Sequence, residues 1–286
     1  MLLASMVLYQ VLFAISLFIL VSLGLAIIFG MMRVINLAQG EFIMLGAYAC
    51  LWFTKLNINF WIAALLASVL VGIFGIIVER CLIRFLYGRI MDTLLATWGL
   101  SLLMIGLVTT VFGPQEAGVE ISMGKVDFGD FSISIYNLAL IAISAGLLCL
   151  TYALWRFTRF GLIVRGTMQN ANMSSALGIN TDKYYMLTFG LGSAITGLAG
   201  ALIAPLVGSQ PTMGSFYIAK AFITVISGGS APLTGTLAAS TIFGSTDGLI
   251  SYGTTQVVGE ISVLLVAIVL LRLLPTGITG RFGGGV

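Results

Sequence analysis

Residues 7–31 read VLYQVLFAISLFILVSLGLAIIFGM, and this run carries no charged side chain. About 20 consecutive apolar residues are enough for a helix to cross the hydrocarbon core of a bilayer. No basic segment precedes the run, no convincing cleavage site follows it, and more apolar runs come after it. We therefore interpret it as a retained first membrane helix rather than a cleaved signal peptide.

The composition extends this interpretation to the whole chain. Only 8% of the 286 residues are charged and 59% are hydrophobic, whereas a soluble domain carries roughly 25% charged residues. No polar stretch is long enough for a separate soluble domain, so we expect residues 1–286 to form a single transmembrane domain. The net charge of +3 comes from basic residues at helix ends, which predicts contact with membrane lipid and no nucleic-acid partner.

Further apolar runs predict helices at 38–54, 60–84, 93–112, 133–155, 185–206 and 259–274. Residues 216–250 are also apolar, but SGGSAPLTG interrupts them at 227–235. We expect two half-length helices there, because broken helices are tolerated at membrane depth where protein or a cavity surrounds them. The predicted fold class is an all-α polytopic integral membrane protein of about eight spans, with a broken or re-entrant helical region near 216–250.

Small residues recur in GLGSAITGLAGA, residues 190–201, at steps of three and four. Small side chains at this spacing let membrane helices approach closely. We favour a packing role for this stretch over a role in lining a path for a solute.

The basic residues predict an orientation. Placing the loop 156–184 inside puts ten basic residues inside and three, Lys55, Lys125 and Lys220, outside. The ten are Arg33, Arg80, Arg84, Arg89, Arg156, Arg159, Arg165, Lys183, Arg272 and Arg281. The loop 113–132 is then external, and its acidic residues are Glu116, Glu120, Asp127 and Asp130. We therefore expect an external N-terminus and a cytoplasmic C-terminus.

Enzymatic chemistry finds little support in the sequence. The chain has no histidine, the commonest general base and metal ligand. It contains no HExxH, CxxC or GxxxxGK[ST] motif, so it carries no ATPase of its own. We expect no catalytic, metal-ligating or cofactor-binding residue.

Glu41, within VINLAQGEF at 34–42, is the single residue that most strongly suggests a functional role. A carboxylate close to the membrane is costly and usually has a partner or a task. It could line a solute path, or it could occupy the first turn of a helix, where the helix dipole stabilises it. The second interpretation is favoured, because Asn36 and Gln39 can share hydrogen bonds with their neighbours.

Hydroxyl groups in other spans are further candidates for contact with a small polar solute. Thr97, Trp98 and Ser101 form a polar group in LLATWGLSL, although hydroxyls also bond back to their own helix. The full candidate path is Asn36, Gln39, Glu41, Thr97, Trp98, Ser101, Ser193, Thr224 and Ser227.

The longest internal polar insert is RFTRFGLIVRGTMQNANMSSALGINTDK, residues 156–183. Within it, 169–177 predicts a short helix that Gly178 ends, and Asn180, Thr181 and Asp182 can cap the next helix. Apolar residues on such a helix can dock into a groove on a partner. The alternative, a helix resting on lipid headgroups, is weaker because aromatic residues are scarce.

Several stretches together resemble one family. They are VINLAQGEFIMLGAY (34–48), DTLLATWGLSL (92–102), FGPQ (112–115), RFGLIVRGTMQNANMSSALGINTDK (159–183), LTFGLGSAITGLAGAL (187–202) and LLPTGITGR (273–281). The chain resembles the permease subunits of ABC importers for branched-chain amino acids and for urea or short amides. The resemblance covers nearly the whole chain, and ATWGLSL and VRGTMQNANMSSALGINT favour the urea-type subgroup. One departure is Gln39, which stands where the family pattern usually has a histidine and which cannot titrate.

The resemblance implies a non-enzymatic subunit of the bacterial inner membrane. It implies two ATP-binding subunits that hold the ATP, a second related permease in a heterodimer, and a periplasmic solute-binding protein. The insert would be the ATPase-coupling loop, with Arg165, Gln169, Asn170, Met173, Ala176, Leu177, Gly178 and Ile179 as its contact residues. The expected solute is urea or a short amide, with a branched-chain amino acid as the alternative. A stand-alone secondary transporter or channel is the alternative of another class.

Overall fold

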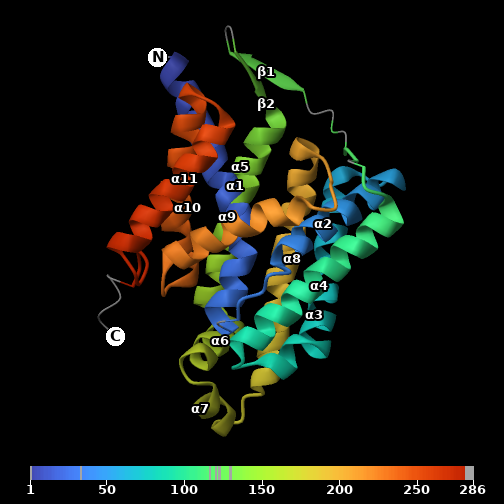
Figure 1. Cartoon of the computed structure of the whole chain (residues 1–286), viewed down its shortest axis with the longest axis vertical. Coiled ribbons are helices and arrows are strands. Elements are labelled where there is room, and N and C mark those ends of the chain that lie inside the picture. Colours follow the sequence, from blue (N-terminus) through green and yellow to red (C-terminus); the bar gives the residue numbers. More distant parts are fainter. Residues whose placement is uncertain are drawn as a thin grey trace. The chain divides into compact units, whose positions relative to one another are not determined.

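The computed structural model describes residues 2–32, 34–115, 117–119, 121, 124–128 and 131–280 (Figure 1). Five residues used in the orientation argument lie outside the described residues: Arg33, Glu116, Glu120, Asp130 and Arg281.

The secondary structure is almost wholly helical. The helices are α1 (Leu2–Met32), α2 (Gln39–Lys55), α3 (Phe60–Cys81), η1 (Ile83–Leu86), α4 (Ile90–Phe112), α5 (Ile135–Phe157), α6 (Arg159–Gln169), α7 (Ala171–Ala176), α8 (Thr181–Val207), α9 (Met213–Gly228), α10 (Pro232–Gly253) and α11 (Gln256–Leu273). Every predicted span is confirmed as a helix, with ends that differ by five residues or fewer. The strands β1 (Lys125–Phe128) and β2 (Phe131–Ser134) form an antiparallel hairpin, with Lys125 opposite Ser134, that the sequence analysis did not predict.

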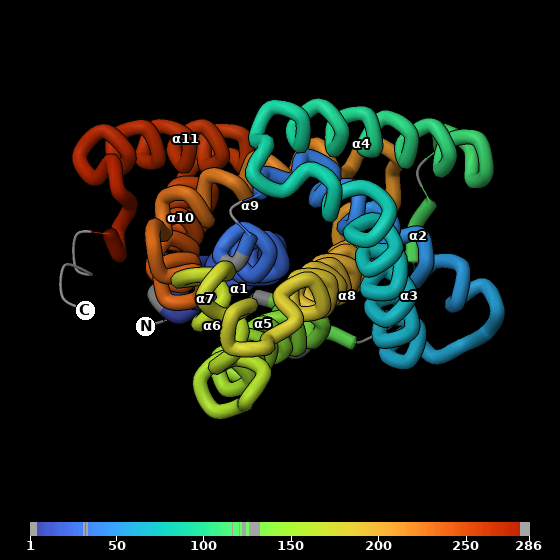
Figure 2. Tube along the Cα trace, turned by 90° about the horizontal axis from the view of Figure 1, so that it is seen from below, coloured from blue at the N-terminus to red at the C-terminus, as the bar shows by residue number. Residues whose placement is uncertain are grey.

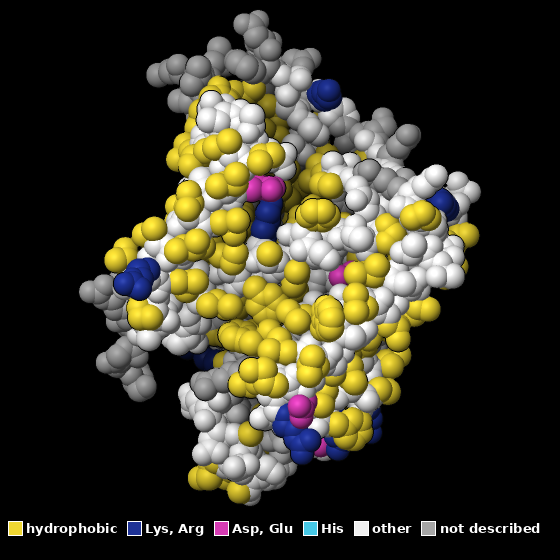
Figure 3. Space-filling model, viewed as in Figure 1, with side chains coloured by type: hydrophobic (Ala, Val, Ile, Leu, Met, Phe, Trp, Pro, Cys, Tyr) yellow, Lys and Arg dark blue, Asp and Glu magenta, His cyan; other side chains and the backbone are white. Residues whose placement is uncertain are grey.

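Six described helices are long and apolar enough to cross a bilayer. The helices α9 and α10 form a seventh candidate as a pair bent by 115°, which confirms the predicted break. The helix α2 lies at the expected place but has only 17 residues. The expected number of about eight spans is reached only if α2 also crosses the membrane. Hydrophobic side chains cover much of the visible surface over α4 (Figure 3), as expected for a face in contact with lipid or protein.

The chain divides into two compact units, and the expectation of a single domain stays a prediction. Unit 1 comprises 1–22, 122–152 and 221–286, and unit 2 comprises 23–121 and 153–220. In unit 1, α10 packs against α11, and the Phe18 and Phe243 rings lie 6.3 Å apart. The buried residues of this core are Phe18, Ala239, Phe243, Val263, Ala267 and Leu270.

Unit 2 is built around α8, which packs along both α2 and α3 (Figure 2). Glycines allow this close approach: a Cβ added to Gly200 would meet the carbonyl of Ile43, and one added to Gly46 would meet the backbone of Gly197. The packing role predicted for residues 190–201 is thus confirmed.

The insert at 156–184 contains more helix than predicted. Asn170 accepts a bond from Met173 N (2.9 Å) and caps α7, so the short helix begins at Ala171 rather than at 169. Gly178 ends it with a φ of +84°, and Asn180 caps α8 as expected. The helix α6 was not predicted, because this polar stretch between two apolar spans, with glycine at 161 and 166, was interpreted as a loop.

Candidate functional site

The candidate site in unit 2 is a buried polar segment, residues 36–41, that enters α2. Asn36 is fully buried, and its Oδ1 accepts a bond from Ala38 N (3.0 Å) while its Nδ2 donates to Gln39 Oε1 (3.2 Å). These bonds form a tight turn that presents the Gln39 and Glu41 side chains at the start of the helix.

The helix α8 holds one side of this segment. Gln39 Nε2 donates to Thr196 Oγ1 (2.6 Å), and the Thr196 hydroxyl donates in turn to the carbonyl of Gly192 (2.9 Å). Thr196 is fully buried. Since the glutamine amide both accepts and donates here, Gln39 connects Asn36 to α8 without needing a titratable group.

The helix α4 holds the other side. Leu37 N donates to Thr97 Oγ1 (3.2 Å), and Ser101 Oγ donates to Glu41 Oε1 (3.1 Å). Thr97 and Ser101 lie four residues apart and therefore on one face of α4. Side-chain hydrogen bonds therefore attach the segment to α4 on one side and to α8 on the other.

Glu41 has one oxygen in use and one oxygen free. The residue is 2% exposed, and its Oε2 has no hydrogen-bond partner among the described residues. A Cβ added to Gly214, at the start of α9, would lie 2.6 Å from Oε2. Glu41 stands in the first turn of α2, where the helix dipole favours a negative charge. The Oε2 atom, which has no hydrogen-bond partner among the described residues, remains able to bind a positive or hydrogen-bonding group.

Other candidate residues lie elsewhere. Trp98 is 55% exposed on α4 and does not join the hydroxyls of Thr97 and Ser101, which corrects the expected cluster. Ser193 is buried against Gly75 of α3, where it packs two helices together. Thr224 and Ser227 are buried in unit 1 and do not belong to the segment described here.

Two members of the site were not identified from the sequence. Neither Thr196 nor Gly214 is among the candidate path residues of the sequence analysis. A signal for Thr196 exists in the sequence, since it lies in the small-residue stretch that brings α8 close to its neighbours. Gly214 carries no such signal, because only the tertiary contacts with Gly40 and Glu41 make a side chain intolerable there.

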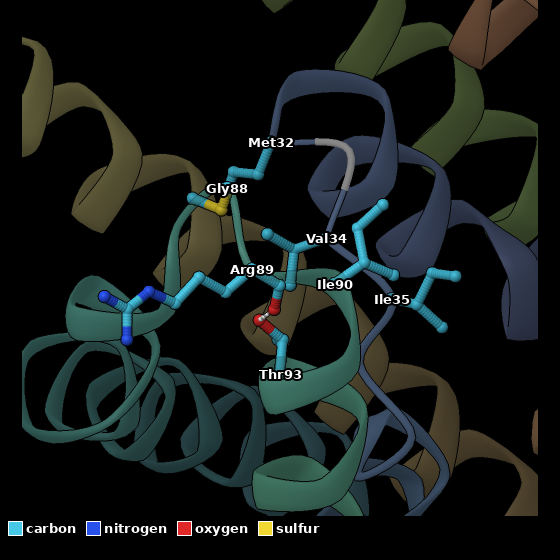
Figure 4. Close-up of a pocket in the computed structure, with 7 residues that line it drawn as sticks. All are labelled: Met32, Val34, Ile35, Gly88, Arg89, Ile90 and Thr93. Atoms are coloured by element: carbon cyan, nitrogen blue, oxygen red, sulfur yellow. Dashed lines mark hydrogen bonds between the residues drawn. The ribbon is translucent and has the colours of Figure 1, made fainter.

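A cavity of about 180 Å³ lies beside this segment (Figure 4). Its wall is mostly apolar, and Arg89 and Thr93 are its polar residues; the lining is Met32, Val34, Ile35, Gly88, Arg89, Ile90 and Thr93. Val34 and Ile35 directly precede Asn36, and Thr93 lies one turn before Thr97 on α4. The cavity therefore lies next to the polar segment and next to the basic end of α4, where Figure 3 shows Lys and Arg side chains gathered.

The polar insert, which contains the short helices α6 and α7, carries exposed apolar side chains. Met173 and Leu177 are 59% and 73% exposed, and Ala176 and Gly178 are exposed beside them. The two helices are held by buried Val164 and Ser174 and by a Trp155–Phe160 ring contact (6.2 Å). Of the remaining residues predicted here, Gln169 and Asn170 are exposed, while Arg165 and Ile179 are half-buried, and Arg165 Nε donates to the carbonyl of Gly161 (3.3 Å).

The chemistry of the site is binding chemistry. Hydroxyls, amides and one carboxylate surround it, and among the described residues no group of three or more Asp, Glu or Cys side chains could hold a metal ion. The side chains can exchange hydrogen bonds with a small solute, and none of them stands as a nucleophile beside a base.

Comparisons with known proteins agree with this picture. The family model described as the permease component of branched-chain amino acid transport systems matches residues 7–274. A high-affinity branched-chain amino acid permease protein, LivH of Salmonella typhimurium, is 29% identical over 93% of this chain and 92% of its own length. A probable LivH of Methanocaldococcus jannaschii is 27% identical over 93% and 89%, and BraD of Pseudomonas aeruginosa is 27% identical over 93% and 92%. No solved structure matches the chain.

The long, apolar helices and the family match over nearly the whole chain lead to one conclusion. The chain is a multi-pass membrane protein that belongs to the family of permease components of branched-chain amino acid transport systems.

Proposed function

We propose that this chain is a permease subunit of an ABC importer that carries a branched-chain amino acid into the cell. The observation that carries the proposal is the family match over residues 7–274, joined by relatives named for branched-chain amino acid transport. The sequence analysis favoured urea or a short amide, and the comparisons support the alternative solute better. Urea therefore becomes the contrasting solute in the test.

The buried segment supports an amino acid as the solute. An amino acid carries an ammonium group, whereas urea is uncharged. Glu41 Oε2 is a buried carboxylate oxygen without a partner in the described chain, and an ammonium donor would compensate it by a charge-assisted hydrogen bond. We propose that Asn36, Gln39, Glu41, Thr97 and Ser101 line the path, and that the neighbouring cavity is its inward end.

The insert supports coupling to an ATPase. Its exposed apolar residues, Met173 and Leu177, are anchors of the kind that fit a groove on a partner protein. Two ATP-binding subunits would bind the ATP, and a second related permease and a periplasmic solute-binding protein would complete the importer. In this arrangement the N-terminus lies outside and the C-terminus in the cytoplasm of a bacterial cell.

The path from the insert to the segment is short. The helix α8 begins within the insert, at Thr181, and Thr196 lies fifteen residues further along it. At 1.5 Å per residue this distance is about 22 Å. A displacement of the insert can therefore reach Gln39 along one continuous helix.

The test is solute uptake into vesicles that contain the chain with its ATPase, its partner permease and its binding protein. We expect uptake of labelled leucine that requires both ATP and the binding protein, and no comparable uptake of urea. Urea uptake under the same conditions would keep the importer and overturn the solute. Uptake of leucine without ATP would overturn the importer in favour of a stand-alone transporter.

A further inference from the structure

The connection between α3 and α4 is tied to the first turn of α8. Arg84 Nη2 lies 2.8 Å from Asp182 Oδ2, although the two residues are 98 positions apart in the chain. Next to this ion pair, the Tyr87 and Tyr185 rings lie 5.1 Å apart. Asp182 is part of the insert that we propose to contact the ATPase, and Tyr185 lies just after it.

The same connection is anchored to α3 by a buried hydrogen bond. Tyr87 Oη donates to Glu79 Oε1 at 2.5 Å, and Glu79 is only 2% exposed. Burial raises the pKa of the Tyr87 phenol far above its ordinary value, and the hydrogen bond to Glu79 raises it further. The phenol thus keeps its proton at physiological pH and remains the donor in this bond.

The connection in turn holds the base of α4. The Thr93 hydroxyl bonds the carbonyls of Leu86 (3.0 Å) and Arg89 (2.7 Å), so the first turn of α4 is fixed to the connection. Arg89, Ile90 and Thr93 of the same turn also line the cavity, together with Val34 and Ile35 (Figure 4). The base of α4 is therefore attached to the connection and also borders free space.

Beyond its base, most of α4 is exposed, since only 17% of its apolar stretch is buried. Its side-chain hydrogen bonds to the polar segment come from Thr97 and Ser101, and near its other end the Phe112 ring lies 4.9 Å from the Tyr48 ring of α2. A movement at the base can therefore tilt α4 about this contact, and any tilt changes the surroundings of Glu41.

We propose that Arg84, Tyr87 and Glu79 form a second transmission link, which carries the movement of the insert to α4 and so to Glu41. A movement of α8 would displace Gln39 through Thr196, and a movement of the link would displace Glu41 through Ser101 on α4. The segment 36–41 would therefore respond to the insert through two separate contacts. These three are positioning residues: they touch no solute and act by placing α4. The inference rests on the proposed coupling to an ATPase.

The test is a charge exchange in the complete importer. Arg84→Asp and Asp182→Arg each place like charges side by side, and the double variant restores an ion pair with the charges reversed. We expect each single variant to hydrolyse ATP at nearly the wild-type rate while its leucine uptake per ATP falls roughly fivefold. The double variant is expected to recover at least half of the lost ratio.

The control is Asp92→Asn, which removes an exposed ion pair with Arg89 (3.8 Å) in the first turn of α4, keeps the Arg89 side chain and leaves the link intact. We expect it to keep the wild-type ratio of uptake to ATP hydrolysis. Tyr87→Phe is a second variant that removes only the phenolic hydroxyl, and it should lower the ratio as the single charge variants do. An unchanged ratio in the single variants and in Tyr87→Phe, or no recovery in the double variant, would overturn the link. If the wild-type importer shows no ATP-dependent leucine uptake, the proposed function itself fails, and the two failures are thereby distinguished.

Discussion

At the scale of the residue, Glu41 decides whether the buried segment recognises charge. Glu41→Gln keeps the size of the side chain and an oxygen to accept the bond from Ser101, and it removes the negative charge. A hydrogen bond to a charged group is worth about 1.5–3 kcal/mol. We therefore expect leucine uptake by the reconstituted importer to fall by roughly 10- to 100-fold, with no loss of folded protein in detergent.

The control for this variant is Ser193→Ala. The Ser193 hydroxyl is also buried, and it has no partner among the described residues, but it faces Gly75 rather than the segment 36–41. Uptake in Ser193→Ala should stay close to that of the wild type. If Glu41→Gln transports leucine as fast as Ser193→Ala does, the carboxylate serves only the first turn of α2.

Individual residues were predictable where a polar or charged side chain interrupted an apolar stretch of the sequence. Asn36, Gln39 and Glu41 were identified because amides and a carboxylate stood between apolar runs. Trp98 was misplaced because sequence neighbours on a helix point in different directions, and only residues at steps of three or four share a face. Gly214 was missed because its lack of a side chain is required by Gly40 and Glu41, which lie more than 170 positions earlier.

At the scale of the element, the apolar runs predicted the helices well because membrane spans are long and almost free of charge. The hairpin at 125–134 was missed, since four-residue strands give too short an alternation to stand out. The helix α6 carries a usable signal, namely Thr158, which accepts a bond from Gly161 N (3.1 Å) as an N-cap. Glycine at 161 and 166 outweighed that signal in the sequence.

The insert itself supplies a prediction at this scale. Leu177 is 73% exposed just after α7, so Leu177→Glu can fold normally while placing a charge on the apolar surface. We expect this variant to lose most of its co-purification with the ATPase subunit and most of its ATP-driven uptake. Lys125→Glu, on the hairpin, changes an exposed charge on the opposite predicted side of the membrane and should co-purify as the wild type does. Equal co-purification of the two variants would move the ATPase contact away from the insert.

At the scale of the whole molecule, the orientation determines which partner meets which end. Ten basic residues lie on the predicted inner side and three on the outer side, and basic loops resist translocation. Binding-protein contact is then expected at the hairpin, and ATPase contact at the insert. An inverted chain would exchange these partners, so the proposed coupling of the insert to an ATPase requires this asymmetry.

Chemical labelling of single cysteines can determine the orientation directly. Cys81 and Cys149 are replaced by serine and the buried Cys50 by alanine, after which Ser132→Cys or Ser175→Cys is introduced at an exposed site. With a membrane-impermeant maleimide on intact cells, we expect labelling of Ser132→Cys alone, because the hairpin is predicted to lie outside. Ser175→Cys, in α7, should react only after the membrane is opened. The reverse pattern would place the insert outside, where no ATP-binding subunit can reach it, and would remove the physical basis of ATP-driven import by this chain.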